Sequence, residues 1–462
     1  MFKYKIILVA IFIFALITPR AVSIAQAVQA DASDQYEILK TFANVITLVE
    51  KNYVEGVNMN QLVEGAIKGM LMTLDPHTSY LNTLTYKSLK EETSGEFGGL
   101  GIEINMKDGL LTVVSPIEDS PAFRAGIQPG DQIIKIEDEY TKNLTLEDAV
   151  KRMKGPKGTA VKISVQRKGA KSLIPVSIVR DIIKVKSVRS RPLDPGYGYI
   201  RLAQFQDGSS DEFKNALDAL GGNSMKGLVI DVRNNPGGLL NQAIRVADLF
   251  LKDGVVVYTE GRLESQKQKY FAHDDGNEPD YPIVLLVNEG SASASEIIAG
   301  ALQDHGRALV LGQQTFGKGS VQTVLPMEGG DALRLTTALY YTKNGRSIQA
   351  EGIKPDIEVE LKPLTKDGEK NGEEQLRIKE KDLPGAIKNP NSKDSGKSKG
   401  KEPIKEELEL EDEDMKPITI RSLMEMDLKE LLKLDSQLDE ALKLLKTWNR
   451  FQAPKEAPPV HT

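Results

Sequence analysis

A serine stands where a buried strand is expected to end and a helix to begin, which is a favourable place for a nucleophile. Ser293 lies in the segment Asn288-Glu289-Gly290-Ser291-Ala292-Ser293-Ala294-Ser295-Glu296, between an apolar strand and an apolar helix. The unpaired N–H groups and the positive dipole end of a helix stabilise negative charge there, as an acyl-transfer enzyme requires for its oxyanion. Because Glu296 follows Ser293 at the spacing S-x-x-E, a plain capping box is the alternative interpretation.

A serine nucleophile needs a base, and the candidates are one lysine and the histidines. Lys318 lies between two glycines after an apolar strand, with no acidic residue beside it in sequence. It can accept a proton only when neutral, so burial must lower its pKa from about 10.4 towards 7–8. A solvent-exposed loop lysine is the alternative. His305 is disfavoured, because a helix that starts at Ser293 places it about 18 Å away. Spacing does not exclude His77 or His273.

The segment that holds Lys318 also admits a nucleotide-binding interpretation. Gly312 to Lys318 match the start of a phosphate-binding loop, G-x-x-x-x-G-K, but Gly319 stands where the Mg²⁺-binding Ser or Thr belongs. This mismatch, together with the late position of the loop in the chain, argues against a nucleotide enzyme.

A second turn offers backbone N–H groups that could hold an oxyanion. The segment Asp231-Val232-Arg233-Asn234-Asn235-Pro236-Gly237-Gly238 follows a buried strand and precedes a helix. Its glycines leave backbone N–H groups unscreened by side chains, which suits the binding of an oxyanion. A simple strand-to-helix turn is the alternative interpretation.

The elements that must position these groups alternate between strands and helices. We expect strands at 199–203, 227–232, 283–287 and 308–311, helices at 211–220, 239–251 and 293–302, and closing strands at 334–341 and 357–361. This alternation predicts an α/β layer fold over residues 183–362. Short β-rich runs at 111–114, 132–136, 161–166 and 174–179, with a helix at 146–153, predict a compact β-rich module over residues 96–182. Helical periodicity predicts a small helical domain over residues 31–95.

The first 30 residues have the order of an export signal. Lys3 and Lys5 precede an apolar run from Ile6 to Ile17, and small residues follow it. The pattern favours a signal peptide cleaved after Ala27 or Ala30, with a retained membrane anchor as the alternative. In either case we expect the body of the protein to lie outside the cytoplasm, in the periplasm or cell envelope, and the alternative would anchor it to the inner membrane.

The chain beyond residue 362 changes in character twice. Residues 363–418 are rich in Pro, Gly, Lys, Glu and Ser, which predicts a disordered charged linker. Residues 419–462 then carry a heptad-like apolar stripe that is interrupted by Asp435 and consists of Met424, Leu428, Leu431, Leu438, Leu442 and Leu445. We expect a C-terminal helical segment that serves as a docking helix or as an oligomer contact.

The composition excludes several partners and chemistries. The net charge is −6 and no concentrated basic face is evident, so nucleic acid is not an expected partner. The sequence contains no cysteine, which excludes a thiol nucleophile, a disulfide and a thiolate metal site. The four histidines lack the paired spacing of a zinc site, so no metal is expected.

Taken together, the motifs resemble those of the carboxyl-terminal processing peptidases, also called tail-specific proteases. The resemblance extends from about Phe42 to Glu360 and rests on six segments in this order: Leu74-Asp75-Pro76-His77-Thr78-Ser79-Tyr80, Gly99-Leu100-Gly101-Ile102, Asp231 to Gly238, Ser291-Ala292-Ser293-Ala294-Ser295-Glu296-Ile297, Phe316-Gly317-Lys318-Gly319 and Gly352-Ile353-Lys354-Pro355-Asp356. It implies an α/β fold, namely a crotonase-like α/β protease core with an inserted β-rich PDZ domain and a helical N-terminal domain.

The resemblance also implies a role for individual residues. Ser293 corresponds to the nucleophile of the family, Lys318 to its base and Gln322 to the glutamine that orients the lysine. A straight strand would hold Lys318 and Gln322 about 13 Å apart, so we expect a bend at Gly319. The oxyanion donors would be the amide of Ala294 and one amide of the Gly237-Gly238 turn, with Gly238 preferred to Gly237. No cofactor is implied.

The implied function is that of a serine endopeptidase that engages protein substrates by their C-terminal tails. The PDZ domain would take up the tail as an added strand, and backbone N–H groups would hold its terminal carboxylate. The residues expected to form this carboxylate loop are Gly98, Gly99, Leu100, Gly101 and Ile102. The alternative is a catalytically inactive PDZ-containing scaffold protein of the cell envelope. An adaptor protein and a homo-oligomer are left open as partners.

Overall fold

The computed structural model describes residues 36–107, 109–360, 378–392, 424 and 426–452. The chain divides into two units, one ending at Thr73 and one beginning at Leu74. In the first unit, residues 36–52 form a helix, and a second helix, α2 (Met59–Met72), begins at Asn58, whose side chain accepts hydrogen bonds from Asn60 and Gln61. The segment predicted as a signal or anchor, residues 1–30, lies outside the described residues. None of the helices in the described ranges has both the length and the apolar character needed to cross a membrane.

The second unit contains a β-rich module with an apolar core of its own. Its strands follow the order β3-β4-β5-β7-β8, with β6 paired to β5. These strands are β3 (Ile102–Lys107), β4 (Leu110–Pro116), β5 (Gln132–Ile136), β6 (Glu139–Tyr140), β7 (Ala160–Gln166) and β8 (Ile174–Val179). Two helices, α4 (Pro121–Arg124) and α5 (Leu146–Met153), accompany the sheet, and α5 begins at a capping box formed by Thr145 and Asp148. Among the described residues, β3 and β8 end the strand order and are the two edge strands of this sheet.

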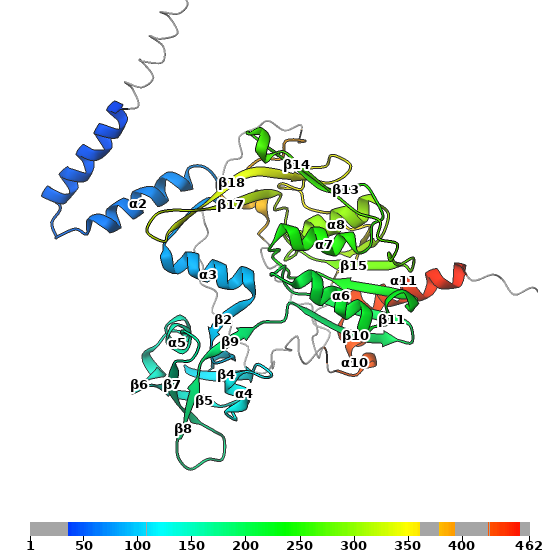
Figure 1. Ribbon diagram of the computed structural model, residues 1–462, viewed down its shortest axis with the longest axis horizontal. Coiled ribbons are helices and arrows are strands. Elements are labelled where there is room, and N and C mark those ends of the chain that lie inside the picture. The colour runs from blue at the N-terminus through cyan, green and yellow to red at the C-terminus, as the bar shows by residue number, and fades with distance from the viewer. Residues whose placement is uncertain (1–35, 108, 361–377, 393–423, 425, 453–462) are drawn as a thin grey trace, which may run out of the picture. The chain divides into compact units, whose positions relative to one another are not determined.

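The module is inserted into the chain of a larger α/β core. Strand β1 (Ser79–Leu81) precedes the module, yet it pairs with β18 (Ala332–Tyr341), far beyond it in sequence. Helix α3 (Thr83–Ser94) follows β1, and the chain then enters and leaves the module through an antiparallel ribbon formed by β2 (Glu96–Gly99) and β9 (Asp181–Lys184). Both ends of the module therefore lie side by side, as Figure 1 shows.

The core is built on a six-stranded sheet of order β10-β11-β12-β15-β16-β19. Its strands are β10 (Val188–Asp194), β11 (Tyr197–Leu202), β12 (Gly227–Asp231), β15 (Ile283–Val287), β16 (Leu309–Gly312) and β19 (Ile357–Glu358). All neighbouring pairs from β11 to β19 are parallel, and β10 is antiparallel to β11. The strands β12 and β15 are buried along their whole length, as expected for a parallel sheet that is covered on both faces.

The two faces of this sheet are covered by different helices. On one face, Leu228 and Ile230 of β12 pack with α6 (Ser209–Ala219), α7 (Leu240–Asp248) and α8 (Ala294–Asp304). On the other face, Val229 packs with α10 (Leu428–Leu434) and α11 (Ser436–Gln452). This follows from the period of two in a strand, which sends alternate side chains to opposite faces. The C-terminal stripe of leucines is thus a docking surface, and the helices it forms are the red segments of Figure 1.

A second sheet stands beside the core sheet. Its order is β1-β18-β13-β14, with β17 also paired to β18. The strands not yet placed are β13 (Val255–Gly261), β14 (Gln268–Phe271) and β17 (Ser320–Pro326). Strand β17 begins directly after the glycine-flanked Lys318, so this sheet fixes one end of the lysine loop.

Part of the stretch predicted as a linker packs against the core. Residues 378–392 contain a 3₁₀ turn at Glu380–Asp382, and the Glu380 side chain is fully buried. It accepts a hydrogen bond from Gln349 at 2.9 Å and pairs with His77 Nε2 at 2.8 Å. This segment differs from the solvated linker expected there because its buried carboxylate finds partners on the core. The rest of the predicted linker, 361–377 and 393–423, lies outside the described residues.

Candidate active site

Ser293 occupies a strained backbone position at the start of α8. Its φ and ψ angles are 55° and −113°, which place a non-glycine residue in the left-handed half of conformational space. Such strain persists only when the surroundings fix it, and it gathers at functional sites. The turn is fixed by Ser291, whose hydroxyl donates to Val232 O at 2.8 Å, and by Ala292, whose N–H donates to Asn235 O at 3.0 Å.

The hydroxyl of Ser293 does not cap the helix. It makes no side-chain hydrogen bond to the first turn of α8, whereas the Ser293 N–H donates to Glu296 Oε2 at 2.8 Å. Of the two bonds of the expected capping box, the structure therefore contains the one from the Ser293 N–H to the Glu296 side chain. The Glu296 N–H donates to the Ser293 carbonyl and not to the Ser293 hydroxyl. The hydroxyl is partly buried and is not engaged by the helix that it precedes.

Glu296 joins the serine turn to the lysine loop. The same oxygen, Oε2, accepts the N–H of Ser293 and the N–H of Lys318, each at 2.8 Å. Because both backbone nitrogens lie 2.8 Å from the same oxygen, the nitrogens of Ser293 and Lys318 cannot be farther apart than twice 2.8 Å. The other oxygen, Oε1, accepts the Gly317 N–H at 2.7 Å and the Thr315 hydroxyl at 2.5 Å. The sequence identified Glu296 only as a helix cap, because its contacts to the lysine loop are tertiary.

Glu296 is fully buried among these donors. Burial raises its pKa to about 7, and the four hydrogen bonds that it accepts act in the opposite direction. All four partners donate, so the arrangement uses the carboxyl group as an acceptor only.

The environment of Lys318 lowers the pKa of its amine. Burial lowers the pKa of Lys318 below its ordinary value, and the nearby Arg334 charge lowers it further. The carboxylates of Glu380, Glu296 and Asp75 act in the opposite direction but do not reverse the shift. A lysine whose pKa is lowered by burial can accept a proton nearer to neutral pH.

Gln322 and Lys318 share no hydrogen bond in the described structure. The Gln322 amide instead donates to the hydroxyls of Ser320 and Thr336, both at 3.1 Å. Thr336 in turn donates to Asp75 at 3.0 Å. A bend was expected at Gly319. The pairing of β17 with β18 instead shifts register between Val321 and Gln322.

The glycine turn after β12 faces the start of α8. A Cβ added to Gly237 would lie 2.8 Å from the Ser293 Cβ and 2.9 Å from the Ala294 nitrogen, so only glycine allows this approach. The N–H of Gly237 is already bonded to Asn235 Oδ1 at 2.9 Å. Gly238 forms a parallel bridge with Phe205, in which Gly237 O and Leu239 N–H make the bonds. The N–H of Gly238 therefore points away from Phe205, and this residue is exposed.

The expected carboxylate loop of the module is held by its carbonyl groups. Gly98 O accepts the Gly155 N–H at 3.1 Å, and Leu100 O accepts the Ala122 N–H at 2.9 Å. Gly101 has a φ of 76°, and a Cβ there would lie 2.3 Å from the Ser120 Cβ. Gly99 ends β2, and Ile102 begins β3, so the loop connects the entry ribbon to the edge strand β3.

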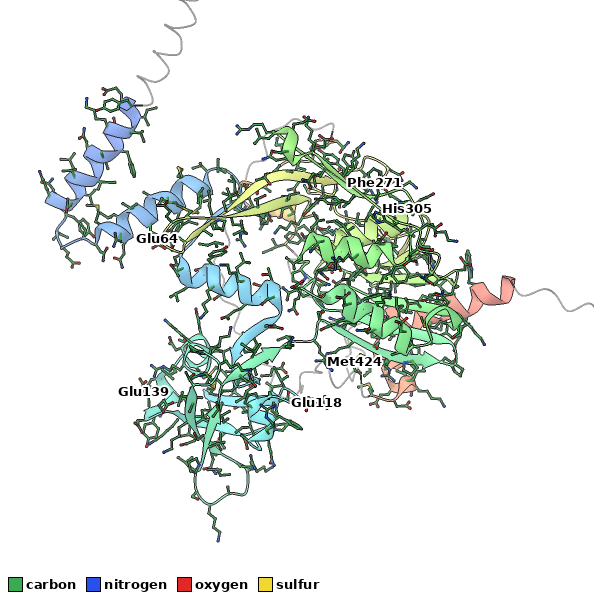
Figure 2. All side chains as sticks on the ribbon, viewed as in Figure 1. Glu64, Glu118, Glu139, Phe271, His305 and Met424 are labelled. Carbon is green, nitrogen blue, oxygen red and sulfur yellow. The ribbon has the colours of Figure 1, made fainter. Side chains whose placement is uncertain are left out.

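The remaining base candidates lie in other settings. His305 terminates α8 and contacts Val255 O through Nε2 at 2.9 Å; Figure 2 shows it at the far end of that helix. His273 is largely exposed and pairs with Asp248. His77 is engaged by the buried Glu380. The structure also excludes a phosphate-binding loop around Lys318, because a strand follows the lysine, where that motif requires a helix.

Comparison with known proteins identifies the family. The model for peptidase family S41 matches residues 196–359, a PDZ domain model matches residues 98–178, and the model for the activating protease CtpB N-terminal domain matches residues 16–85. The chain is 45% identical to the carboxy-terminal-processing protease of Bartonella bacilliformis over 365 residues. The aligned region covers 78% of this chain and 83% of that protein. The chain belongs to the carboxy-terminal processing proteases.

A second curated relative supports the assignment. The chain is 38% identical over 323 residues to the carboxy-terminal processing protease CtpA of Bacillus subtilis, which covers 69% of this chain and 68% of that protein. Among solved structures, the photosystem II D1 C-terminal processing protease is 29% identical, with a TM-score of 0.42, and covers 70% of this chain and 93% of that one.

The family assignment confirms the predicted fold class and the predicted kind of enzyme. The protein is a serine-type peptidase with an α/β core of family S41, an inserted PDZ domain and a helical N-terminal region. Within the described residues, no three or more His, Cys, Asp or Glu side chains gather to form a possible metal site.

Proposed function

We propose that this protease is an endopeptidase in which Ser293 is the nucleophile and Lys318 is its general base. The observation that carries the proposal is the shared Glu296 oxygen, which accepts the backbone N–H groups of both residues. The strained φ of Ser293 and the lowered pKa of Lys318 support it independently. Strained backbone and shifted pKa values both gather at functional sites, which favours an enzyme over a scaffold protein.

The proposed reaction begins with transfer of the Ser293 hydroxyl proton to the neutral Lys318 amine. The serine oxygen attacks the scissile carbonyl carbon, and the carbonyl oxygen becomes an oxyanion bound by the amides of Ala294 and Gly238. The peptide C–N bond then breaks, and the protonated lysine returns its proton to the leaving amine. Water attacks the resulting ester by the same route and releases the enzyme. We propose Gln322 as a residue that orients Lys318 once substrate is bound.

We propose that the PDZ domain selects substrates by their C-terminal tails. Strand β3, which follows the carboxylate loop directly, is one of the two edge strands of its sheet in the described structure, and an extended peptide can add to such an edge through main-chain hydrogen bonds. The N–H groups of the loop formed by Gly98, Gly99, Leu100, Gly101 and Ile102 would hold the terminal carboxylate. We further propose that the enzyme acts outside the cytoplasm, on the grounds of the basic and apolar order of its first 30 residues.

The test compares wild type with Ser293→Ala and Lys318→Ala on an unstructured protein that ends in apolar residues. We expect wild type to cleave it, both variants to lose activity by a factor of about 10³ or more, and an amidated C-terminus to weaken cleavage. Both variants should unfold at the same denaturant concentration as wild type, which would show that the protease core still folds, and they should bind the tail with equal affinity. Cleavage that persists in both variants would refute the dyad, whereas tight tail binding without cleavage by any form would favour the scaffold.

A further inference from the structure

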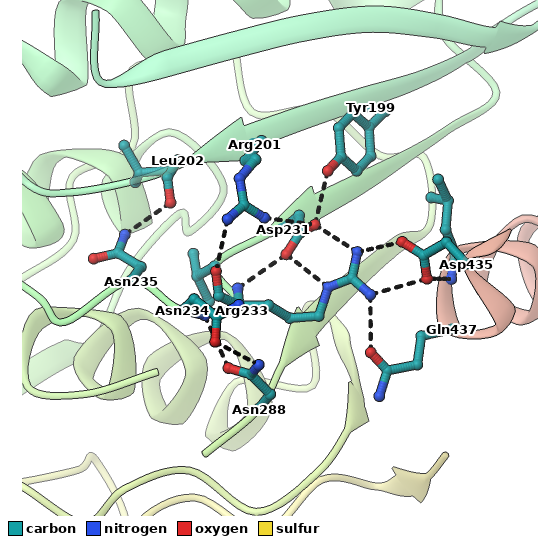
Figure 3. A network of polar contacts seen from close by, with 12 residues as sticks. Tyr199, Arg201, Leu202, Asp231, Arg233, Asn234, Asn235, Asn288, Asp435 and Gln437 are labelled. Atoms are coloured by element: carbon teal, nitrogen blue, oxygen red, sulfur yellow. Dashed lines mark hydrogen bonds and ion pairs between the residues drawn. The ribbon is translucent and has the colours of Figure 1, made fainter. Parts of the chain in front are cut away.

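A cluster of buried charges adjoins the start of the turn that carries Gly237 and Gly238. Asp231 at the end of β12 is fully buried, and its carboxylate accepts hydrogen bonds from Tyr199, Arg201 and Arg233 at 2.7, 3.2 and 2.7 Å. Burial works against the charged form of Asp231, yet the two guanidinium groups hold its pKa below the ordinary value. Figure 3 shows these side chains converging on the Asp231 carboxylate.

The protease core by itself leaves this cluster with an excess of positive charge. It contributes the guanidinium groups of Arg201 and Arg233, whose side chains are 14% and 10% exposed, but only the single carboxylate of Asp231. A buried charge without a partner is strongly unfavourable. Some further group must therefore balance the second guanidinium.

The balancing carboxylate comes from the C-terminal helices. Asp435 lies 202 residues after Arg233 and accepts two hydrogen bonds from its guanidinium, at 2.9 and 2.6 Å. Gln437 accepts a third at 2.9 Å. Within the described part of the chain, these contacts and those to Asp231 engage every nitrogen of the Arg233 guanidinium. The pairing with Asp435 is bidentate, which fixes orientation as well as charge.

The position of Asp435 explains why the apolar stripe is interrupted there. The residue lies between α10 and α11, and its Oδ1 also accepts the Leu438 N–H at 3.0 Å in the first turn of α11. A leucine at this position would continue the stripe but would leave Arg233 without its second partner. The interruption is therefore a polar contact to the core and not a weak point of the helix.

Arg233 is the first residue of the turn that carries the proposed oxyanion donor. Its carbonyl accepts a hydrogen bond from Arg201 at 3.1 Å. The next residue, Asn234, has a φ of 55° and exchanges hydrogen bonds with the Asn288 side chain at 2.8 and 2.9 Å. Movement of the Arg233 backbone would thus be transmitted through Asn234 towards Gly238.

We propose that Asp435 is a positioning residue of the catalytic site. Asp435 neutralises the positive charge of Arg233. It thereby holds the turn from Asn234 to Gly238 at the distance from Ser293 that oxyanion binding requires. Asp435, between α10 and α11, then supports the active site, whereas the apolar residues of these helices cover the sheet. This inference rests on the proposed role of the Gly238 amide.

The test is Asp435→Asn in the full-length chain, which removes the charge and keeps the shape of the side chain. We expect kcat to fall by a factor of about 10–100, since small displacements of catalytic groups cost about this much, while KM changes little. A peptide boronic acid, which mimics the tetrahedral intermediate, should lose affinity by the same factor. The affinity of an uncleaved C-terminal peptide for the PDZ domain should not change. Asp435→Glu should recover part of kcat, because it restores the charge.

The matched control is Leu442→Ala, which weakens the docking of α11 without touching Arg233. Leu442 is 3% exposed, so this change should lower the melting temperature at least as much as Asp435→Asn while leaving kcat near that of wild type. The proposal fails if Asp435→Asn retains wild-type kcat, or if Leu442→Ala lowers kcat and boronate affinity equally, since α11 would then be only an anchor. Loss of the dyad role would instead appear as persistent cleavage by Ser293→Ala, so the two failures are distinguishable.

Discussion

At the scale of single residues, the site is organised by charges that surround one amine. In the proposed mechanism Lys318 must be neutral to accept a proton from Ser293, so protonation of Lys318 below its pKa should remove activity. Arg334 and burial favour the neutral form, whereas Glu380, Glu296 and Asp75 favour the charged form. The pH below which activity is lost should therefore follow the pKa of Lys318, which these charged groups raise or lower.

Two charge-neutralising substitutions should shift this acid limb in opposite directions. Arg334→Gln removes a positive charge that disfavours protonation, so the pKa of Lys318 rises and the acid limb moves to higher pH. Glu380→Gln removes a negative charge that favours protonation, so the acid limb moves to lower pH. The pH dependence of kcat/KM measures both shifts, with Glu264→Gln, an exposed change on the surface, as the control. Shifts of the same sign in both variants would contradict a lysine base.

At the scale of elements, the proposed mechanism requires a close approach of two turns. The turn after β12 and the turn before α8 are joined by Asn235, whose carbonyl accepts the Ala292 N–H at 3.0 Å and the Ser295 hydroxyl at 2.9 Å. The glycines of the first turn have φ angles of 103° and 134° and leave no room for a side chain. Strand β12 and helix α8 have regular geometry, and the candidate site arises from the close approach of the two turns that adjoin them.

Gly238→Ala tests this approach. A Cβ at Gly238 would lie 2.2 Å from Phe205 O, so the turn must shift, and we expect kcat to fall by a factor of about 10²–10³, as for loss of an oxyanion donor. Gly276→Ala is the matched control, because Gly276 also has a positive φ, 75°, but no atom within 4 Å of an added Cβ. The control should cost about 1–2 kcal/mol of stability and no activity. Equal losses of activity in both variants would count against the oxyanion role of this turn.

At the scale of the whole molecule, the second unit contains separate apolar cores. The PDZ domain buries its own cluster around Ile133, Ile163 and Val165, and the protease core buries another on each face of its sheet. Domains with separate cores can lose stability independently. Substrate selection and peptide hydrolysis are therefore expected to respond separately to mutation.

Ile163→Ala tests this independence. Ile163 is fully buried in the PDZ core, and its truncation should destabilise that domain by about 2–5 kcal/mol. We expect a raised KM for a substrate with a free apolar tail and an unchanged rate of cleavage of a short peptide that does not reach the PDZ domain. Denaturant unfolding should show an early transition that Ile163→Val, with a smaller cost of about 0.5–1.5 kcal/mol, shifts less. Equal loss of activity on both substrates would mean that the two domains do not act separately.

The sequence by itself determined the elements and the candidate groups, because local periodicity and turn chemistry are readable along the chain. The predicted strand at 132–136 and the helix at 146–153 match β5 and α5, and Ser293 begins a helix as expected. The strands β13, β14 and β17 were not anticipated; β14 has only four residues and β17 is only partly buried, so neither presents a run of buried apolar residues.

Only the tertiary structure decided which distant groups meet. Glu296 reads as a cap, Glu380 as part of a charged linker and Asp435 as a break in a stripe, yet their partners lie 22, 303 and 202 residues away at Lys318, His77 and Arg233. A carboxylate has the same local pattern whether it faces water or a buried cation. Its role depends on which surfaces the folded sheets bring together, and that information is not local to any segment of the sequence.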